Sequence, residues 1–198
     1  MNYYVVTYTG PFGFIKPWTA VRDGETFSQQ FLTPSIVEGM EKKLFPELLT
    51  ERGIFKILRY RLAYSGMSRQ MEVIQAADYQ LKGIKGEKRF KTASRKTSIL
   101  FRNVLLNPVL RLAFSSLEDA ERAADQHLCL CRNEDLLFPN SDILELDQSE
   151  FEGLDGFELR FGSELPGAFL VGYNRFHEAA PMYGALEING NASQYALV

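Results

Sequence analysis

Positive charge in this chain is concentrated in one segment, residues 82–102, with the sequence KGIKGEKRFKTASRKTSILFR. Eight Lys or Arg residues stand there against one acid, so the segment carries +7, whereas the whole chain carries −3 and the remainder −10. The eight are Lys82, Lys85, Lys88, Arg89, Lys91, Arg95, Lys96 and Arg102. Cations along an extended segment neutralise nucleic-acid phosphates, and Phe90 among them offers a ring on which a base can stack. The pattern favours nucleic-acid binding; the alternative is a solvated loop, the usual meaning of a charge run.

Residues suited to catalysis are few. The chain has two histidines, of which His127 stands late in an expected helix and His177 in an expected loop. Phosphate loops of the Walker type, nucleophile elbows and metal-ligand spacings are missing from the sequence. An acidic cluster could imitate a metal site, but its irregular spacing is more typical of a solvated face; it comprises Asp142, Glu145, Asp147, Glu150, Glu152 and Asp155. The residues therefore favour binding over catalysis, with no catalytic residue and no metal or other cofactor expected.

Length and composition indicate an ordinary globular protein. The 198 residues suffice for one substantial core or a compact domain with a smaller partner. No apolar run is long enough to cross a membrane, and the first residues do not have the pattern of a secretory signal. Cys129 and Cys131 are separated by one residue, which is a poor spacing for a disulfide. We therefore expect a cytoplasmic protein without a membrane partner.

The first part of the chain alternates strand and helix signals. Residues 2–8 are rich in β-branched and aromatic types and predict a buried strand. Apolar residues at helical spacing, preceded by Thr33 as N-cap and Pro34, predict a helix over about 34–45. Residues 54–64 alternate as a long strand does and carry Arg59 and Arg61 on one face.

A long excursion follows, over residues 66–98, and we interpret it as a hairpin that carries the basic run on its return limb. The apolar stretch 98–114 predicts a strand that is broken at Asn107-Pro108 and then continues. Ser116 is a suitable N-cap for a helix from 117 to about 128. This order predicts an α+β fold with a ferredoxin-like (RNA-recognition-type) βαββαβ domain and a long basic hairpin insertion.

Residues 133–198 show only short strand patterns, separated by Gly, Pro, Asn and Asp. Asn189-Gly190 predicts a tight turn. We therefore divide the chain into a domain over 1–132, with 66–98 as its thumb-like excursion, and a small β-rich C-terminal portion over 133–198 that packs on it.

Three motifs in sequence order resemble the Cas-five family of the RAMP superfamily, most closely its type I-C branch. They are the first strand with GPFGFIKP and FLTPSIVEGMEKKLF, then RKTSILFRNVLLNPVLRLAF, and finally FLVGYNRFHEAAPMYGALEING. The resemblance covers both ends and the middle, and is loose over 66–95 and 129–165. It implies the same ferredoxin-like fold and a subunit that holds the 5′ handle of guide RNA in a type I CRISPR Cascade complex.

In the type I-C branch the same subunit cuts precursor guide RNA, with a tyrosine after the first helix and a Lys-His pair beginning the second. Phe45 occupies the tyrosine position here, and Leu117, Glu118 and Asp119 begin the second helix. Phe45 has no hydroxyl, and the acidic pair would repel the scissile phosphate. We therefore expect a non-catalytic subunit.

The expected partners are the guide RNA and the backbone and large subunits of the complex. The Lys and Arg residues expected to bind phosphates are the eight above together with Lys16, Arg59 and Arg61, and the expected base-stacking residues are Phe14, Trp18 and Phe90. Three alternatives remain, one of which is a general RNA-binding module outside CRISPR systems. A stand-alone homologue, which a phage could carry, would displace the true subunit and inhibit interference. A metal-independent endoribonuclease would process precursor guide RNA, with His127 as a substitute base.

Overall fold

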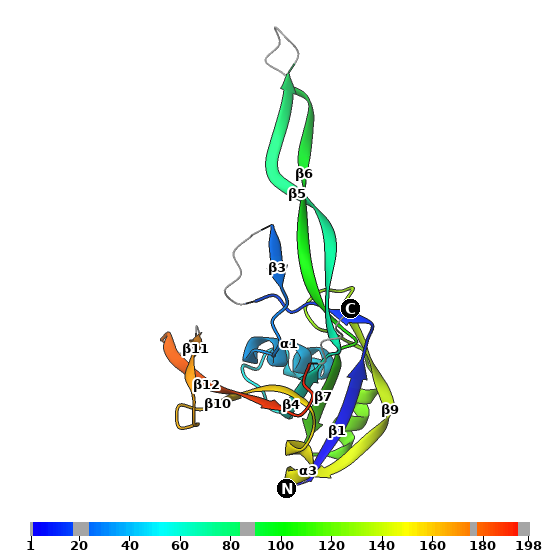
Figure 1. Ribbon diagram of the computed structural model, residues 1–198, viewed down its shortest axis with the longest axis vertical. Helices are drawn as coiled ribbons and strands as arrows, with labels where there is room; N and C mark the ends of the chain where they lie inside the picture. Colours follow the sequence, from blue (N-terminus) through cyan, green and yellow to red (C-terminus); the bar gives the residue numbers. More distant parts are fainter. Residues whose placement is uncertain (1, 18–23, 84–89, 175–177, 194–198) are drawn as a thin grey trace.

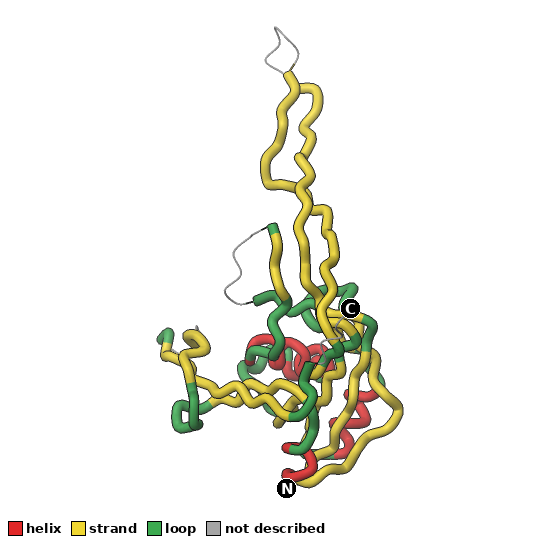
Figure 2. Tube along the Cα trace, viewed as in Figure 1, coloured by secondary structure: helices red, strands yellow, loops and turns green. Residues whose placement is uncertain are grey.

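The computed structural model describes residues 2–17, 24–83, 90–174 and 178–193, with the main chain alone over 75–83, 90–96 and at residue 174. A body of sheet and helices carries a long two-stranded hairpin that projects along the longest axis of the molecule (Figure 1). Strands contain far more residues than helices do, and the helices lie only in the body (Figure 2). The α+β class is confirmed.

Within the described residues, eight strands form the main sheet. In spatial order they are β11 (Phe169–Asn174), β12 (Ala180–Asn189), β10 (Gly156–Phe161), β4 (Ile57–Ala63), β7 (Val109–Phe114), β1 (Asn2–Thr9), β9 (Leu136–Asp147) and β8 (Leu128–Cys129). Each neighbouring pair within β4–β7–β1–β9 is antiparallel. The predicted strands over 2–8 and 54–64 are therefore observed, and the second of them begins three residues later than expected.

Two helices pack on the sheet and close the core. The first, α1 (Pro34–Leu44), follows Thr33 as predicted, although the Thr33 side chain makes no capping hydrogen bond, and a 3-10 turn over Pro46–Leu48 follows it. In α2 (Leu117–Ala124), Ser116 accepts a hydrogen bond from the Asp119 N–H, as the sequence predicted. The prediction that this helix reaches about 128 is wrong. Leu128 instead enters β8 and is fully buried in the core, which ends the helix four residues earlier.

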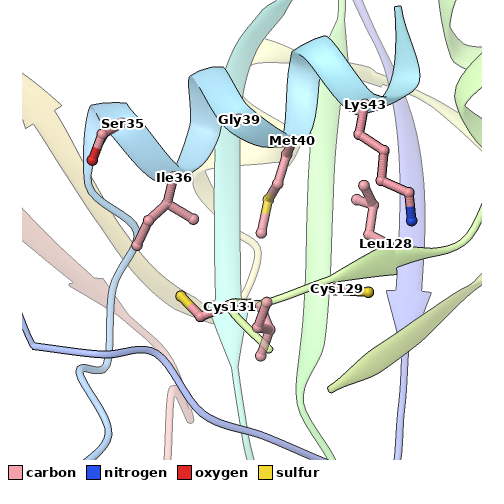
Figure 3. A pocket seen from close by; sticks show the side chains of 9 residues that line it. Ser35, Ile36, Gly39, Met40, Lys43, Leu128, Cys129 and Cys131 are labelled. Carbon is pink, nitrogen blue, oxygen red and sulfur yellow. The ribbon is translucent and has the colours of Figure 1, made fainter. Parts of the chain in front are cut away.

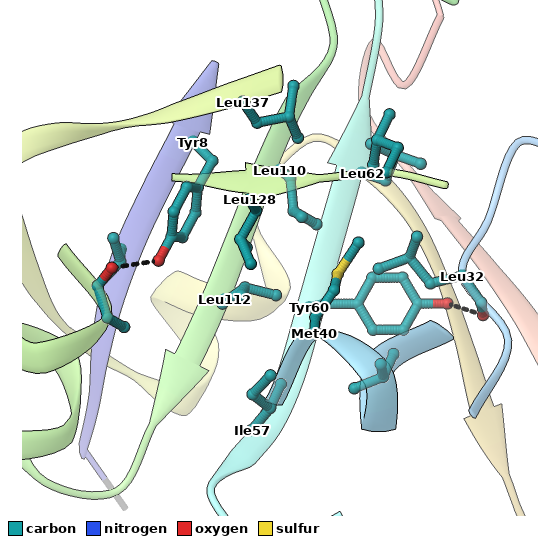
Figure 4. Packing of buried hydrophobic residues seen from close by; sticks show 14 of the residues in the cluster. Tyr8, Leu32, Met40, Ile57, Tyr60, Leu62, Leu110, Leu112, Leu128 and Leu137 are labelled. Carbon is teal, nitrogen blue, oxygen red and sulfur yellow. Dashed lines mark hydrogen bonds between the residues drawn. The ribbon is translucent and has the colours of Figure 1, made fainter. Parts of the chain in front are cut away.

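Buried tyrosines join the helices and loops to the sheet (Figure 4). The Tyr8 hydroxyl donates to the Ala123 carbonyl at 2.6 Å, and the Tyr60 hydroxyl donates to the Leu32 carbonyl at 2.7 Å. Because a buried hydroxyl without a partner is costly, these bonds fix where α2 and the segment before α1 lie on the sheet. Burial raises the pKa of both phenols, so both stay neutral at ordinary pH.

The projecting hairpin consists of β5 (Gly66–Gly83) and β6 (Phe90–Leu106), and we call it the arm. The two strands pair antiparallel from Gly66 opposite Leu106 to Gly83 opposite Phe90. Two short strands join the base of β6: β2 (Phe12–Gly13) antiparallel and β3 (Glu25–Phe27) parallel. A hairpin begins at residue 66 as predicted, but its return strand continues to Leu106, eight residues beyond the predicted end at 98. The predicted break at Asn107-Pro108 is confirmed, since Asn107 has a φ of 46° there and the chain passes into β7.

The strands after residue 133 continue the main sheet. β9 pairs with β1, and β10 pairs with β4 before β12 and β11 extend the sheet outward. A short helix, α3 (Gln148–Glu152), connects β9 to β10 and begins with a capping box between Asp147 and Glu150. The residues assigned from sequence to a C-terminal portion therefore share one sheet with the residues before them.

Candidate nucleic-acid interface

The basic run lies on the arm, but the structure describes few of its side chains. Lys85, Lys88 and Arg89 fall outside the described residues, as does the expected stacking residue Trp18. Main chain alone is described for Lys82 on β5 and for Phe90, Lys91, Arg95 and Lys96 on β6. Arg102, near the base of β6, is the member of the run whose side chain is described.

At the base of the arm, Arg102 meets an arginine that the sequence did not single out. The guanidinium carbons of Arg102 and Arg132 lie 5.3 and 5.4 Å from the centroid of the Phe14 ring. Phe14 itself is 3% exposed, so its ring supports the two cations instead of stacking on a base, contrary to the expectation for this residue. A guanidinium over an aromatic face is attracted by the ring's negative charge distribution.

Arg132 is held in place by a buried carboxylate. Its Nε and one of its terminal nitrogens donate to Asp135 at 2.9 and 2.6 Å, and Asp135 is fully buried. Hydrogen bonds with Asp135, followed by the charges of Asp135, Glu134 and Glu72, raise the pKa of the Arg132 guanidinium. A guanidinium group fixed in this way presents its remaining N–H groups in one orientation, which suits bidentate binding of a phosphate.

Lys16 approaches the same place from the loop after β2. Its main-chain N–H donates to the Cys131 sulfur, next to Arg132, and its side chain is exposed. A side chain at Gly13 would overlap Leu130, so glycine allows β2 to pack against the segment that carries Arg132. Lys16, Arg102 and Arg132 together are called the arm-base cluster below.

Acids accompany the arm-base cluster at the surface. Glu72 bonds to Arg102 at 3.0 Å, and Glu134 lies 3.5 Å from Arg132; both carboxylates are well exposed. Surface ion pairs contribute about 0–1 kcal/mol each. An incoming phosphate can therefore replace these carboxylates at little cost.

The opposite face of the arm carries a second arginine that the sequence did not single out. The Arg69 guanidinium carbon lies 3.6 Å from the centroid of the Phe101 ring, and Arg69 bonds to Glu25 at 3.0 Å. Phe101 and Arg102 are neighbours on β6, so their side chains point to opposite faces of the arm. Arg69, which lies over Phe101, is therefore on the face opposite to Arg102. Each face of the arm therefore begins with an arginine placed over an aromatic ring.

Arg59 and Arg61 do not belong to this surface. Arg59 forms a two-point ion pair with Glu158 at 2.7 Å for each bond, and Arg61 pairs with Glu158 at 2.9 Å and with Glu187 at 3.4 Å. Arg61 is 2% exposed, and the Arg59 side chain is largely buried. The sequence placed both on one face of a strand, but on that face the carboxylates of Glu158 and Glu187 and the ring of Phe151 in α3 surround the two guanidiniums, so neither is presented to a phosphate.

The positions associated with cleavage in the resembled branch lie together between α1 and α2. Phe45 is fully buried, with the Lys56 Nζ 4.5 Å and the Arg122 guanidinium carbon 5.0 Å from its ring centroid. Lys56 forms an ion pair with Asp119. His127 is exposed with its ring 6.3 Å from that of Phe138, and His177 lies outside the described residues.

A small pocket of about 200 Å³ lies between α1 and β8 (Figure 3). It is lined by Ser35, Ile36, Gly39, Met40, Lys43, Leu128, Cys129, Leu130 and Cys131. This volume is below the usual range for small-molecule sites, about 300–1,000 Å³. Within the part of the chain that the structure describes, no group of three or more His, Cys, Asp or Glu side chains could hold a metal ion. Among the same residues, no helix is long and apolar enough to cross a membrane.

Comparison with known proteins gives a structural likeness only. No protein-family model matches the chain, and no curated protein matches it. Among solved structures, the chain is similar to a chain described as "CRISPR RNA-guided surveillance complex", with a TM-score of 0.52 and 12% sequence identity. The similarity covers 96% of this chain and 92% of that chain, and it shows that the two share a fold over nearly their whole length.

Proposed function

We propose that this chain is a non-catalytic subunit of a Cascade-type CRISPR surveillance complex and that it binds the 5′ handle of the guide RNA. The observation that carries the proposal is the whole-length fold similarity to a chain of an RNA-guided surveillance complex. The concentration of cations on the arm of an otherwise acidic chain supports it independently.

The order of elements supports a ferredoxin-like, RNA-recognition-type core. Along the chain the elements run β1, α1, β4, β7, α2 and β9, with the arm inserted between β4 and β7. In space the four strands are ordered β4–β7–β1–β9 with all neighbours antiparallel. We propose that this core displays the arm, so that RNA lies along the arm and against the arm-base cluster.

The surroundings of Phe45 support the non-catalytic assignment. Metal-independent RNA cleavage needs groups that take and give protons at the reacting oxygens. Phe45 has no such group, and the nearby Lys56 is neutralised by Asp119. Incubation of the purified protein with precursor guide RNA in EDTA tests this assignment. We expect the RNA to remain intact; a discrete cut that disappears in His127→Ala would favour the endoribonuclease alternative.

The binding proposal is tested by titrating fluorescent guide RNA with the wild-type chain and with Lys88→Ala/Arg89→Ala over a series of salt concentrations. Each phosphate contact with single-stranded RNA contributes about 0.7 to the slope of log affinity against log salt. We expect the double variant to bind more weakly and with a smaller slope. Unchanged affinity and slope would mean that the basic run is only a solvated loop.

Co-expression with an active complex distinguishes a subunit from an inhibitor. We expect the chain to be retained in a complex that contains guide RNA and that still binds its target. Loss of interference on co-expression would instead favour the displacing homologue.

A further inference from the structure

We propose that β11 is an open edge of the main sheet to which a protein partner adds a strand. The inference rests on the proposed function, because a subunit of a surveillance complex has protein neighbours. In the described part of the chain, β11 pairs with β12 and with no other strand. It lies at the end of the sheet away from the arm (Figure 1).

The hydrogen bonds of β12 show which groups of β11 point outward. Tyr183 on β12 accepts a hydrogen bond from the Gly162 N–H, so its main-chain groups point toward β10 and away from β11. Its partner Leu170 is therefore in a non-hydrogen-bonded pair, and the N–H and C=O of Leu170 point to the open edge.

The same geometry applies at the other end of the strand. Tyr173 is paired with Pro181, which has no N–H. Pro181 lies two residues before Tyr183, so its carbonyl points in the same direction as that of Tyr183, away from β11. Proline is tolerated in a sheet where its nitrogen faces away from a ladder. The N–H and C=O of Tyr173 therefore also point to the open edge. Leu170 and Tyr173 offer two main-chain pairs in the geometry that an added strand uses.

The side chains of β11 do not protect this edge. Proteins usually shield edge strands with charges, proline or very short strands. The β8 strand, at the opposite end of the sheet, has only two residues, whereas β11 has six, FLVGYN, with neither charge nor proline. A register shift between Leu170 and Gly172 bends the strand, but it leaves Leu170 44% and Tyr173 59% exposed.

Area favours a partner protein over a second copy of this chain. A six-residue strand is about 20 Å long, and a sheet is about 10 Å thick, so pairing β11 with itself would bury roughly 400 Å² in total. A stable interface needs about 1,000 Å² or more. The additional surface is available beside the edge, where Phe161 and Phe169 share one face opposite Gly184 and are both well exposed. The partner therefore presents an extended strand together with an apolar surface that covers these two rings.

The test compares Tyr173→Pro with Tyr173→Ala. Both variants remove the ring, but only proline removes the outward N–H, and neither removes a hydrogen bond to β12. Each is co-expressed with guide RNA and with the backbone and large subunits of the proposed complex. We expect Tyr173→Pro to lose one protein subunit from the purified complex by tenfold or more. Tyr173→Ala should lose it less, and both should bind RNA as the wild type does.

Hydrogen exchange and light scattering complete the test. In the wild-type complex, exchange over 169–174 should slow at least tenfold relative to the free chain. Full assembly with Tyr173→Pro, or unchanged exchange over 169–174, would overturn the added strand and leave the proposed function standing. Dimerisation of the free chain that Tyr173→Pro abolishes would show a second copy at this edge instead. A wild-type chain that neither assembles nor binds RNA would overturn the proposed function itself.

Discussion

Two regions of this molecule place a pair of arginines over a phenylalanine, and they serve different purposes. At the arm base, Arg102 and Arg132 lie 5.3 and 5.4 Å from the Phe14 ring. In the body, Arg59 and Arg61 lie 5.2 and 5.6 Å from the Phe151 ring. The arrangement of cation and ring is thus nearly the same in both regions.

The two regions differ in the carboxylates that pair with their arginines. Glu158, which binds both body arginines, is itself buried. At the arm base Arg132 also has a buried partner, Asp135. Arg102, however, pairs with the exposed Glu72, and both arm-base arginines are more exposed than those of the body. A buried carboxylate between buried cations cannot exchange with a ligand, because removing it leaves uncompensated charge. An exposed carboxylate can exchange. Similar arginine pairs therefore join β10 and β12 to β4 in one place, and in the other they form the phosphate sites that we propose.

The largest effect is expected from Glu158→Gln. The substitution leaves Arg59 and Arg61 buried with too little negative charge, and breaking a buried ion pair costs about 3–5 kcal/mol. Urea unfolding at pH 7 measures the free energy of unfolding. Glu152→Gln is the matched control, since Glu152 is exposed and lies 3.9 Å from Arg59. Equal losses in the two variants would contradict the distinction between the two regions.

Lowering the pH is expected to have a smaller effect on the stability of the protein. Burial alone would raise the pKa of the Glu187 carboxyl, but the hydrogen bond from Arg160 and the charges of Arg160, Arg59 and Arg61 outweigh it and lower the pKa. The unfolded chain therefore takes up the proton first, so this stabilisation is present at neutral pH and is lost as pH falls below about 4.5.

Melting temperatures of the wild type and of Glu187→Gln, taken from pH 7 to about pH 3, check this expectation. The difference between the two proteins should shrink toward acid pH. A difference that stays constant over this range would mean that the Glu187 charge contributes nothing to the body network.

The smallest effect is expected from Glu72→Gln. Removing a carboxylate that competes with phosphate for Arg102 should strengthen RNA binding, by at most about fivefold, because a surface ion pair contributes no more than about 1 kcal/mol. Fluorescence anisotropy with labelled guide RNA measures the change. Glu164→Gln, on an exposed loop before β11, is the control and should bind as the wild type does.

Local patterns in the sequence predicted much of this fold. The arm, the break at Asn107-Pro108 and the first helix depend on neighbouring residues, and the structure contains all three. Alternation also placed Arg59 and Arg61 on one face. Alternation could not predict that Glu158 would pair with these arginines on that face, because Glu158 is about a hundred positions further along the chain.

The arm-base cluster was only partly predictable, for the same reason. Arg102 was found because it ends a charge run, and Lys16 because it lies in the loop after the first predicted strand. Arg132 is an isolated cation, and its role depends on Asp135 and Phe14, which tertiary packing brings to it. The sequence predicted that Phe14 would be available to stack on a base, and only the packing shows that its ring is buried beneath two arginines.

The salt dependence of guide-RNA binding by Lys16→Ala/Arg102→Ala/Arg132→Ala tests the central claim most directly. Loss of three phosphate contacts should reduce the slope of log affinity against log salt by about two relative to the wild type. Arg132→Ala leaves the buried Asp135 without its cation, so we expect a lower melting temperature and compare RNA binding at a temperature at which the variant is still folded. A slope and an affinity equal to those of the wild type would contradict the assignment of the arm base as an RNA-binding surface.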